Sequence, residues 1–286
     1  MRITYLILVL ILLIGVSGSW SQRQLWTNGT ANTIGHKDIQ IAALSPSIYG
    51  ISESMDISSH VFACIFAPNV SLKKNWLKKS RLSIASGHGI YYPTPLAKQI
   101  ASRNYFPSLT DSTIIPDVIA VRSELLISYG WGETDCPAFT GEEFNPENTF
   151  RGHTQLVTLK LGIQSGFNRG IFPLVNEPLL FQRSYYYNNN LCYYAGFDID
   201  GHMTTFIDYA IDLDYYNFSE GVYALEHKGM IKWFMGKKFF HLMLGYHVSY
   251  ADTPTGSEFL FGPMLDFVWI MHRNKMELGL FGKKMF

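Results

Sequence analysis

Residues 205–216 read TFIDYAIDLDYY, and two kinds of side chain alternate along this stretch. Every second position from residue 207 carries a large apolar side chain, namely Ile207, Tyr209, Ile211, Leu213 and Tyr215. The positions between them carry small or acidic side chains, namely Asp208, Ala210, Asp212 and Asp214. Successive side chains of a β-strand point to opposite faces, whereas a helix would scatter the acidic residues around its surface. The stretch therefore predicts a strand with one apolar face and one acidic face.

The same alternation recurs along most of the chain after residue 35, and clusters of turn-forming residues separate the alternating segments. One such cluster, Asn188-Asn189-Asn190, predicts a hairpin between two tyrosine-rich runs. The expected strands are 37–45, 54–66, 69–77, 81–91, 116–130, 153–164, 178–187, 191–199, 204–216, 222–234, 238–250, 259–271 and 275–286, and a short strand near 47–51 would add one more. The pattern predicts an all-β fold, a transmembrane antiparallel up-and-down β-barrel of about 12–14 strands.

The length of the segments favours a membrane barrel over a soluble one. Segments 117–129, 205–216 and 222–234 have 12 or 13 residues, whereas globular strands average about 5–6 residues and tilted membrane strands need about 9–11. Aromatic residues gather at segment ends, as at Trp131 and Trp233, where membrane barrels carry aromatic girdles. The alternative is a secreted soluble β-sandwich or barrel, because the alternation alone is the same in both.

Composition excludes several classes of protein. The chain has 286 residues, of which 47% are hydrophobic and 16% charged, with 23 basic and 23 acidic residues. This hydrophobic fraction excludes a disordered chain, and the absence of basic excess argues against nucleic-acid binding. Cys64, Cys136 and Cys192 have no metal-binding spacing and form no disulfide framework. We therefore expect no metal and no cofactor.

The first residues predict export. Arg2 precedes an apolar run at 5–14, and small residues follow it, as in a secretory signal peptide. The apolar run is shorter than the roughly 20 residues of a transmembrane helix. Cleavage before Gln22 would give a signal peptide at 1–21 and one barrel domain at 22–286.

The chain resembles bacterial outer-membrane β-barrel proteins, specifically uncharacterised exported barrels. The resemblance rests on the signal peptide, on the hairpin Tyr49-Gly50-Ile51-Ser52-Glu53-Ser54-Met55-Asp56-Ile57 and on the terminal Phe286. It implies a cell outer-membrane location and contact with the lipid bilayer and lipopolysaccharide. It also implies recognition of Phe286 as an assembly signal by the barrel-assembly machinery. The resemblance supplies no substrate.

The most distinctive candidate site is the expected lumen face of two neighbouring strands and the strands that follow them. Facing strands bring side chains within about 4.5–5.5 Å, close enough for ion pairs. The expected lumen-lining residues are Asp208, Asp212, Asp214, Glu226, Lys228, Lys232, His241, His247 and Asp266. Such a wall either selects a polar solute that passes through the lumen or forms a salt-bridge network that fills it, and the sequence leaves both interpretations open.

Function is predicted only in outline. We expect a passive, porin-like channel for a small solute, or a barrel with a structural role, with no catalytic residues and no enzyme activity. The alternative is an outer-membrane hydrolase that modifies lipid or lipopolysaccharide, for which Ser58 with His60 would be candidates. His60, His88, His241 and His247 are the histidines considered for catalysis or metal binding, and polar interior histidines are the simpler interpretation. Basic residues around 73–81 are candidates for contact with anionic headgroups. The oligomeric state stays open.

Overall fold

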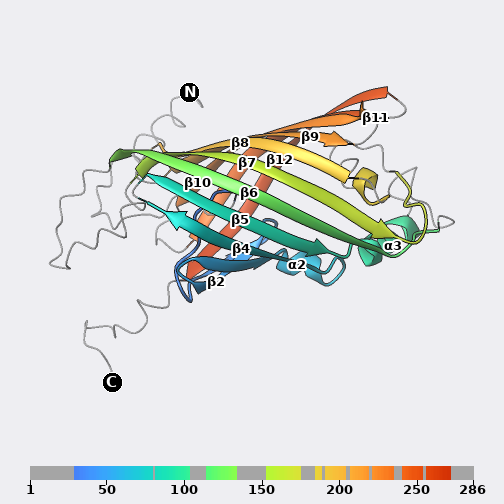
Figure 1. The fold of residues 1–286 in the computed structure, drawn as a ribbon, viewed down its shortest axis with the longest axis horizontal. Coiled ribbons are helices and arrows are strands. Elements are labelled where there is room, and N and C mark those ends of the chain that lie inside the picture. Colours follow the sequence, from blue (N-terminus) through green and yellow to red (C-terminus); the bar gives the residue numbers. More distant parts are fainter. Residues whose placement is uncertain are drawn as a thin grey trace, which may run out of the picture.

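The computed structural model of the protein describes residues 29–79, 81–103, 114–133, 153–174, 184–188, 191–203, 207–218, 221–234, 240–253 and 256–271. Within these ranges, twelve antiparallel strands pair with their neighbours in chain order, and β1 pairs with β12 to close a barrel. Figure 1 shows the long strands side by side as a slanted wall. The predicted up-and-down barrel is confirmed, and twelve is the lower end of the predicted range.

The strands differ in length around the barrel. The three short strands are β1 (Ile39–Ala42), β2 (Ser47–Ser52) and β3 (Met55–Ser59). The nine longer strands are β4 (Asn69–Lys78), β5 (Leu82–Tyr91), β6 (Val118–Glu133), β7 (His153–Asn168), β8 (Leu191–His202), β9 (Ile207–Phe218), β10 (Tyr223–Phe234), β11 (Phe240–Thr253) and β12 (Gly256–Met271). Two helices, α2 (Val61–Cys64) and α3 (Thr94–Ser102), follow β3 and β5. No helix of the described residues is long and apolar enough to cross a membrane.

Two expected strands are wrong in part. At the end of the strand expected at 178–187, residues 184–186 form a helical turn instead, and the three neighbouring tyrosines at 185–187 are all buried. Residues 178–183 lie outside the described residues. A strand would point one of these adjacent rings away from the other two, whereas a turn packs all three against the interior. The strand expected at 54–66 ends at Ser59, because 61–64 form α2. The optional strand near 47–51 does form, as β2. The signal peptide, the strand at 275–286 and Phe286 lie outside the described residues.

The barrel wall has the reverse polarity of a soluble protein. On β9, Asp208 and Asp214 are only 4% and 5% exposed, whereas Leu213 is 43% exposed. The exposed apolar side chains recur on the outer face of every long strand, as at Leu125, Leu161 and Leu244. Lipid offers no hydrogen bonds to a backbone, so a sheet spans it only as a closed barrel with apolar side chains outside. The fold is therefore that of a transmembrane β-barrel.

An apolar cluster fills one end of the barrel. Tyr185, Tyr186 and Tyr187 pack with Phe172 and with buried residues of α3 against the inner ends of several strands. Figure 1 shows α3 at the right-hand end of the long strands. The helix is tied to the rim, because the Val118 amide donates a 2.8 Å hydrogen bond to Thr94 Oγ1. A second hydrogen bond links the segment before α3 to the residue before β6, because the Tyr92 hydroxyl donates to Asp117 Oδ1 (2.9 Å). This bond lowers the pKa of the Asp117 carboxyl.

Closure of the barrel depends on a short seam. β12 pairs with β11 from residue 256 to residue 269, but it pairs with β1 only over residues 268–271. Beside this seam, the Asp266 carboxylate accepts hydrogen bonds from the amides of Ala43 (3.0 Å), Leu44 (2.8 Å) and Ser45 (2.7 Å). The Ser45 hydroxyl also donates to Asp266. One buried carboxylate thus holds the β1–β2 turn against β12.

Replacing this carboxylate should weaken the closed barrel. In Asp266→Ala, three amide donors lose a charged acceptor, and we expect the free energy of unfolding to fall by about 1–3 kcal/mol. Urea unfolding in lipid vesicles, followed by heat-modifiable gel mobility, measures this change. Asp252→Ala is the matched control, because Asp252 accepts from the Ser257 hydroxyl at an exposed hairpin. Equal stability of the two variants would contradict the role of Asp266.

Candidate functional site

Regular strand pairing builds a polar row across the inner wall of the barrel. From β5 to β12, each strand places one residue at the same register position. Each of these residues except the glycine points its side chain into the lumen. The members of the row are Ser83, Ser128, Thr158, Asp198, Asp212, Lys228, His247 and Gly262. The next row includes Lys160, Gly196, Asp214 and Glu226. Because these pairings contain no register shift, charged side chains of β7, β8, β9 and β10 meet in one region of the lumen.

Lys160 lies at the centre of this region. Its Nζ atom is 2.8 Å from Asp198 Oδ1 and 2.7 Å from Asp212 Oδ1 and from Asp214 Oδ1. The Lys160 side chain belongs to β7, and it passes over β8 to reach the two carboxylates of β9. Gly196 of β8 permits this crossing, because a Cβ atom there would collide with Lys160 and Asp214. We call this group the lysine cage: Lys160, Asp198, Asp212 and Asp214.

The lysine cage has the donors of a cation site. One oxygen from each of its three carboxylates lies within 4.8 Å of the others, and carboxylate oxygens are ligands that Ca²⁺ and Mg²⁺ prefer. The Lys160 ammonium already takes the central position among these oxygens. The cage is therefore a cluster of three carboxylates whose bound cation is the ammonium group of Lys160.

Ion pairs continue from the cage to β10 and β11. Lys228 Nζ lies 3.9 Å from Asp212 and 3.1 Å from Glu226, and His247 Nε2 lies 3.7 Å from Glu226. Asp200 is 3% exposed, and its Oδ2 atom has no hydrogen-bond partner among the described residues. The described inner wall of β7 to β10 carries six carboxylates and three lysines. The carboxylates are Asp198, Asp200, Asp208, Asp212, Asp214 and Glu226, and the lysines are Lys160, Lys228 and Lys232. This wall therefore has an excess of negative charge.

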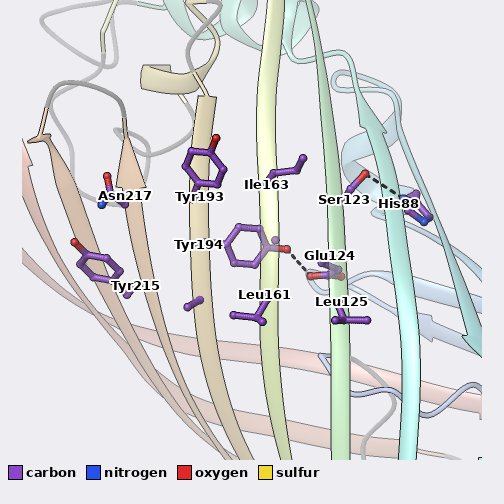
Figure 2. Close-up of a pocket in the computed structure, with 12 residues that line it drawn as sticks. His88, Ser123, Glu124, Leu125, Leu161, Ile163, Tyr193, Tyr194, Tyr215 and Asn217 are labelled. Carbon is purple, nitrogen blue, oxygen red and sulfur yellow. Dashed lines mark hydrogen bonds between the residues drawn. The ribbon is translucent and has the colours of Figure 1, made fainter. Parts of the chain in front are cut away.

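A second charged group lies nearer the apolar end of the lumen. Arg122 forms an ion pair with Glu124. The Tyr194 hydroxyl donates to Glu124 Oε2 (2.6 Å) and accepts from Arg122 Nε (2.8 Å). Figure 2 shows Tyr194 reaching across toward Glu124. The ring lies over Gly162, where a Cβ atom would collide with it. Once again, a glycine on the intervening strand lets a long side chain reach past its neighbour.

The segment 29–36 passes through the lumen, and residues 30–34 are all less than 9% exposed. The Ala31 amide donates to Ser128 Oγ on β6 (2.8 Å), and the Ala31 carbonyl accepts from Asn75 on β4 (2.8 Å). On β3, Asp56 accepts from the Ile34 amide (3.3 Å). The segment thus lies against the inner wall formed by β3 to β6. It has no periodic pattern that would place it there, and its only signal is a run of small residues.

The nine expected lumen residues lie as follows. Seven are buried: Asp208, Asp214, Glu226, Lys232, His241, His247 and Asp266. Asp212 and Lys228 are partly exposed. Three facing pairs form between β9 and β10, namely Asp214 with Glu226, Asp212 with Lys228, and Asp208 with Lys232. The Asp266 carboxylate accepts hydrogen bonds from the β1–β2 turn. His60, a candidate for catalysis, lies at the same turn, with its Nδ1 atom 3.1 Å from the Leu44 carbonyl oxygen.

Sequence reasoning missed the residues that connect these strands. The alternation over 157–164 placed Lys160 on the polar face, but it contained nothing about the register of β7 against β8. Asp198, Asp200, Arg122 and Glu124 were missed as site residues for the same reason. Non-local register is not encoded in the alternation of one strand.

Comparisons with known proteins concern the architecture. No protein-family model and no curated protein matches the chain. Two structures of OmpT, an outer membrane protein of Vibrio cholerae, are similar at 8% identity over 81% of this chain. The outer-membrane expressed form has a TM-score of 0.37, and the in-vitro folded form has 0.38. The chain spans 63% and 64% of the OmpT chains, less than two thirds of their length. The KdgM porin, in complex with disordered oligogalacturonate, is similar at 8% identity, with a TM-score of 0.30 over 82% of this chain and 92% of its own.

These similarities carry no inference about activity. The location of the protein follows instead from the polarity of its own barrel. Its closed barrel has an apolar exterior and a charged interior, which is the arrangement of the barrels that span outer membranes. The chain is an outer-membrane β-barrel in contact with the lipid bilayer. The location and the class predicted from the sequence are confirmed.

Removing the Lys160 ammonium from the lysine cage should cause a large loss of stability. Lys160→Met leaves three neighbouring carboxylates without their shared ammonium, and we expect the free energy of unfolding in lipid vesicles to fall by about 3–5 kcal/mol. Adding Asp198→Asn and Asp214→Asn should recover part of the loss. Lys98→Met is the control, because its pair with Asp117 is exposed and worth about 0–1 kcal/mol. Similar losses in Lys160→Met and Lys98→Met would contradict the cage.

Proposed function

We propose that the protein is a passive, cation-preferring conduit across the outer membrane, in a closed state, rather than an enzyme. The observation that supports this most is the charge of the inner wall, where six carboxylates face three lysines on β7 to β10. Rings of acidic side chains select cations in channels. The solute is a small cation or a small molecule with a positive charge.

The energetics of buried charge favour this function over a purely structural role. Removing a carboxylate from water costs several kcal/mol, and a buried ion pair is often no more stabilising than apolar packing of the same volume. A barrel that only had to fill its interior would have no need for excess carboxylates. Their retention is explained if solute cations or water reach them when the lumen is open.

Two features close the lumen in this state. The Lys160 ammonium takes the central position among three carboxylates, and the segment 29–36 crosses the lumen nearby. The two meet at Gly29, where a Cβ atom would lie 2.9 Å from Asp198 Oδ2. Opening therefore requires the segment to leave, after which the carboxylates are accessible.

The predicted partners stay proposals. Basic residues at Lys73, Lys74, Lys78, Lys79 and Arg81 are candidates for contact with lipopolysaccharide phosphates. Phe286 is the candidate signal for the barrel-assembly machinery. Lys73 also has an internal contact, since its Nζ lies 3.6 Å from Asp56 Oδ2, so the exposed Lys78 and Lys79 are the better candidates for the membrane surface.

Ion selectivity tests the acidic wall. In planar bilayers with a KCl gradient, the wild-type reversal potential should indicate preference for potassium. Asp212→Asn should lower the permeability ratio about twofold or more, because it removes a partly exposed negative charge from the lumen. Asp252→Asn, at an exposed hairpin, should leave the ratio unchanged. A wild-type preference for chloride would contradict the proposal.

Displacing the internal segment tests the closed state. Ala31 is fully buried beside Ala85 and Leu126, so Ala31→Trp overpacks this contact and should expel the segment. We expect a higher single-channel conductance and a greater open fraction. Leu44→Trp is the control, because Leu44 is 71% exposed in the β1–β2 turn. Folded Ala31→Trp protein that conducts no more than the control would exclude the segment as the closing element.

A further inference from the structure

The outer wall of the barrel carries a hollow that the conduit does not use. Its volume is about 660 Å³, and it lies on β5 to β9. Its outward-facing lining includes Leu125, Leu161, Ala195 and Tyr215, together with His88, Ser123, Tyr193 and Asn217. A second hollow of about 350 Å³ adjoins it on β4 to β6, and His88 and Ser123 line both. These two side chains therefore stand between two depressions in the lipid-facing surface.

The polar residues of the larger hollow lie toward one end of it. Figure 2 shows His88, Ser123, Tyr193 and Asn217 at one level across the strands, on the side nearer the helices, with Ile163 between Ser123 and Tyr193. Leu125, Leu161 and Tyr215 lie below them in the same view. Tyrosine side chains at one level of a barrel wall mark the interface between hydrocarbon and headgroups. The hollow thus has a polar rim at interface level and an apolar floor toward the hydrocarbon.

A chain of hydrogen bonds runs from two of the rim side chains, Ser123 and His88, to Ser86 and Trp76. His88 Nδ1 lies 3.1 Å from Ser123 Oγ, and His88 Nε2 lies 3.3 Å from Ser86 Oγ. Trp76 Nε1 donates to the same Ser86 oxygen (2.8 Å). Polar groups on a lipid-facing wall are unfavourable unless they have partners. Both ring nitrogens of His88 are taken up by these contacts. When His88 Nδ1–H donates to Ser123 Oγ, the Ser123 hydroxyl proton is left to donate to a ligand with ester or phosphate oxygens.

We propose that the larger hollow binds one glycerophospholipid of the surrounding bilayer. Its acyl chains lie on the floor of Leu125, Leu161, Ala195 and Tyr215. Its ester region accepts a hydrogen bond from the Ser123 hydroxyl, which His88 orients, and the smaller hollow extends the apolar surface beyond His88. A bilayer phospholipid is the occupant that matches this arrangement, because it presents oxygens at the interface and hydrocarbon below.

Two independent changes remove the site. Ala195→Phe fills the floor of the hollow with a ring, because Ala195 is exposed between larger neighbours. The double change His88→Leu with Ser123→Ala keeps the shape and removes the polar rim. Heat-modifiable gel mobility shows that each variant is folded before lipid binding is measured.

Matched controls exist on β10 and β11, outside both hollows. His227 is also an outward histidine, whose Nε2 lies 3.0 Å from the Tyr246 hydroxyl, and His227→Leu removes a polar group without touching either hollow. Val248→Phe adds a ring to the exterior of β11. Neither control should change phospholipid binding.

Native mass spectrometry in detergent, with phosphatidylethanolamine as the added probe, tests the proposal. We expect wild-type protein and both controls to retain one lipid, and the two site variants to bind it about tenfold more weakly. Equal binding by Ala195→Phe and Val248→Phe would overturn the proposal. Retention of lipopolysaccharide in place of phosphatidylethanolamine would also overturn it. Conversion of the probe to its lyso form would overturn it in favour of ester hydrolysis at Ser123.

Discussion

The closed ring of backbone hydrogen bonds is the constraint on which the rest of this molecule depends. Lipid satisfies no amide or carbonyl group, so each strand of the barrel needs a neighbour on both sides. Here the final pairing is made by β1, a strand of four residues, against the end of β12. The Asp266 carboxylate accepts from three amides of the following turn and holds this seam. A residue expected to line the lumen thus serves closure.

Once the ring is closed, alternation divides the side chains between two different solvents. The outer face meets hydrocarbon, and the inner face is left with the charged residues. Buried charges need partners, and Lys160 supplies one to three carboxylates at once. Glycines make these long contacts possible: Gly196 lies under the Lys160 side chain, and Gly162 lies under Tyr194. These two glycines are as important to the network as its charged side chains.

The lumen and the exterior present separate opportunities for function. Inside, excess carboxylates and a displaceable segment suit the passage of small cations. Outside, a hollow with a polar rim and an apolar floor suits a lipid. The same strand serves both, since on β6 Glu124 faces the lumen while the neighbouring Ser123 faces the bilayer.

The sequence by itself determined the class of fold, the location and the face on which many of the charged strand residues lie. These properties are local, because two-residue alternation over 10 or more residues is enough to define a membrane strand. The tyrosines at 185–187 were misassigned because a run of aromatic residues has no alternation to read. Only the tertiary structure decided which charges meet. The Lys160 contacts depend on the register of β7, β8 and β9, and the path of residues 29–36 depends on the shape of the lumen. Both are set by pairings between segments far apart in the chain, which no single segment encodes.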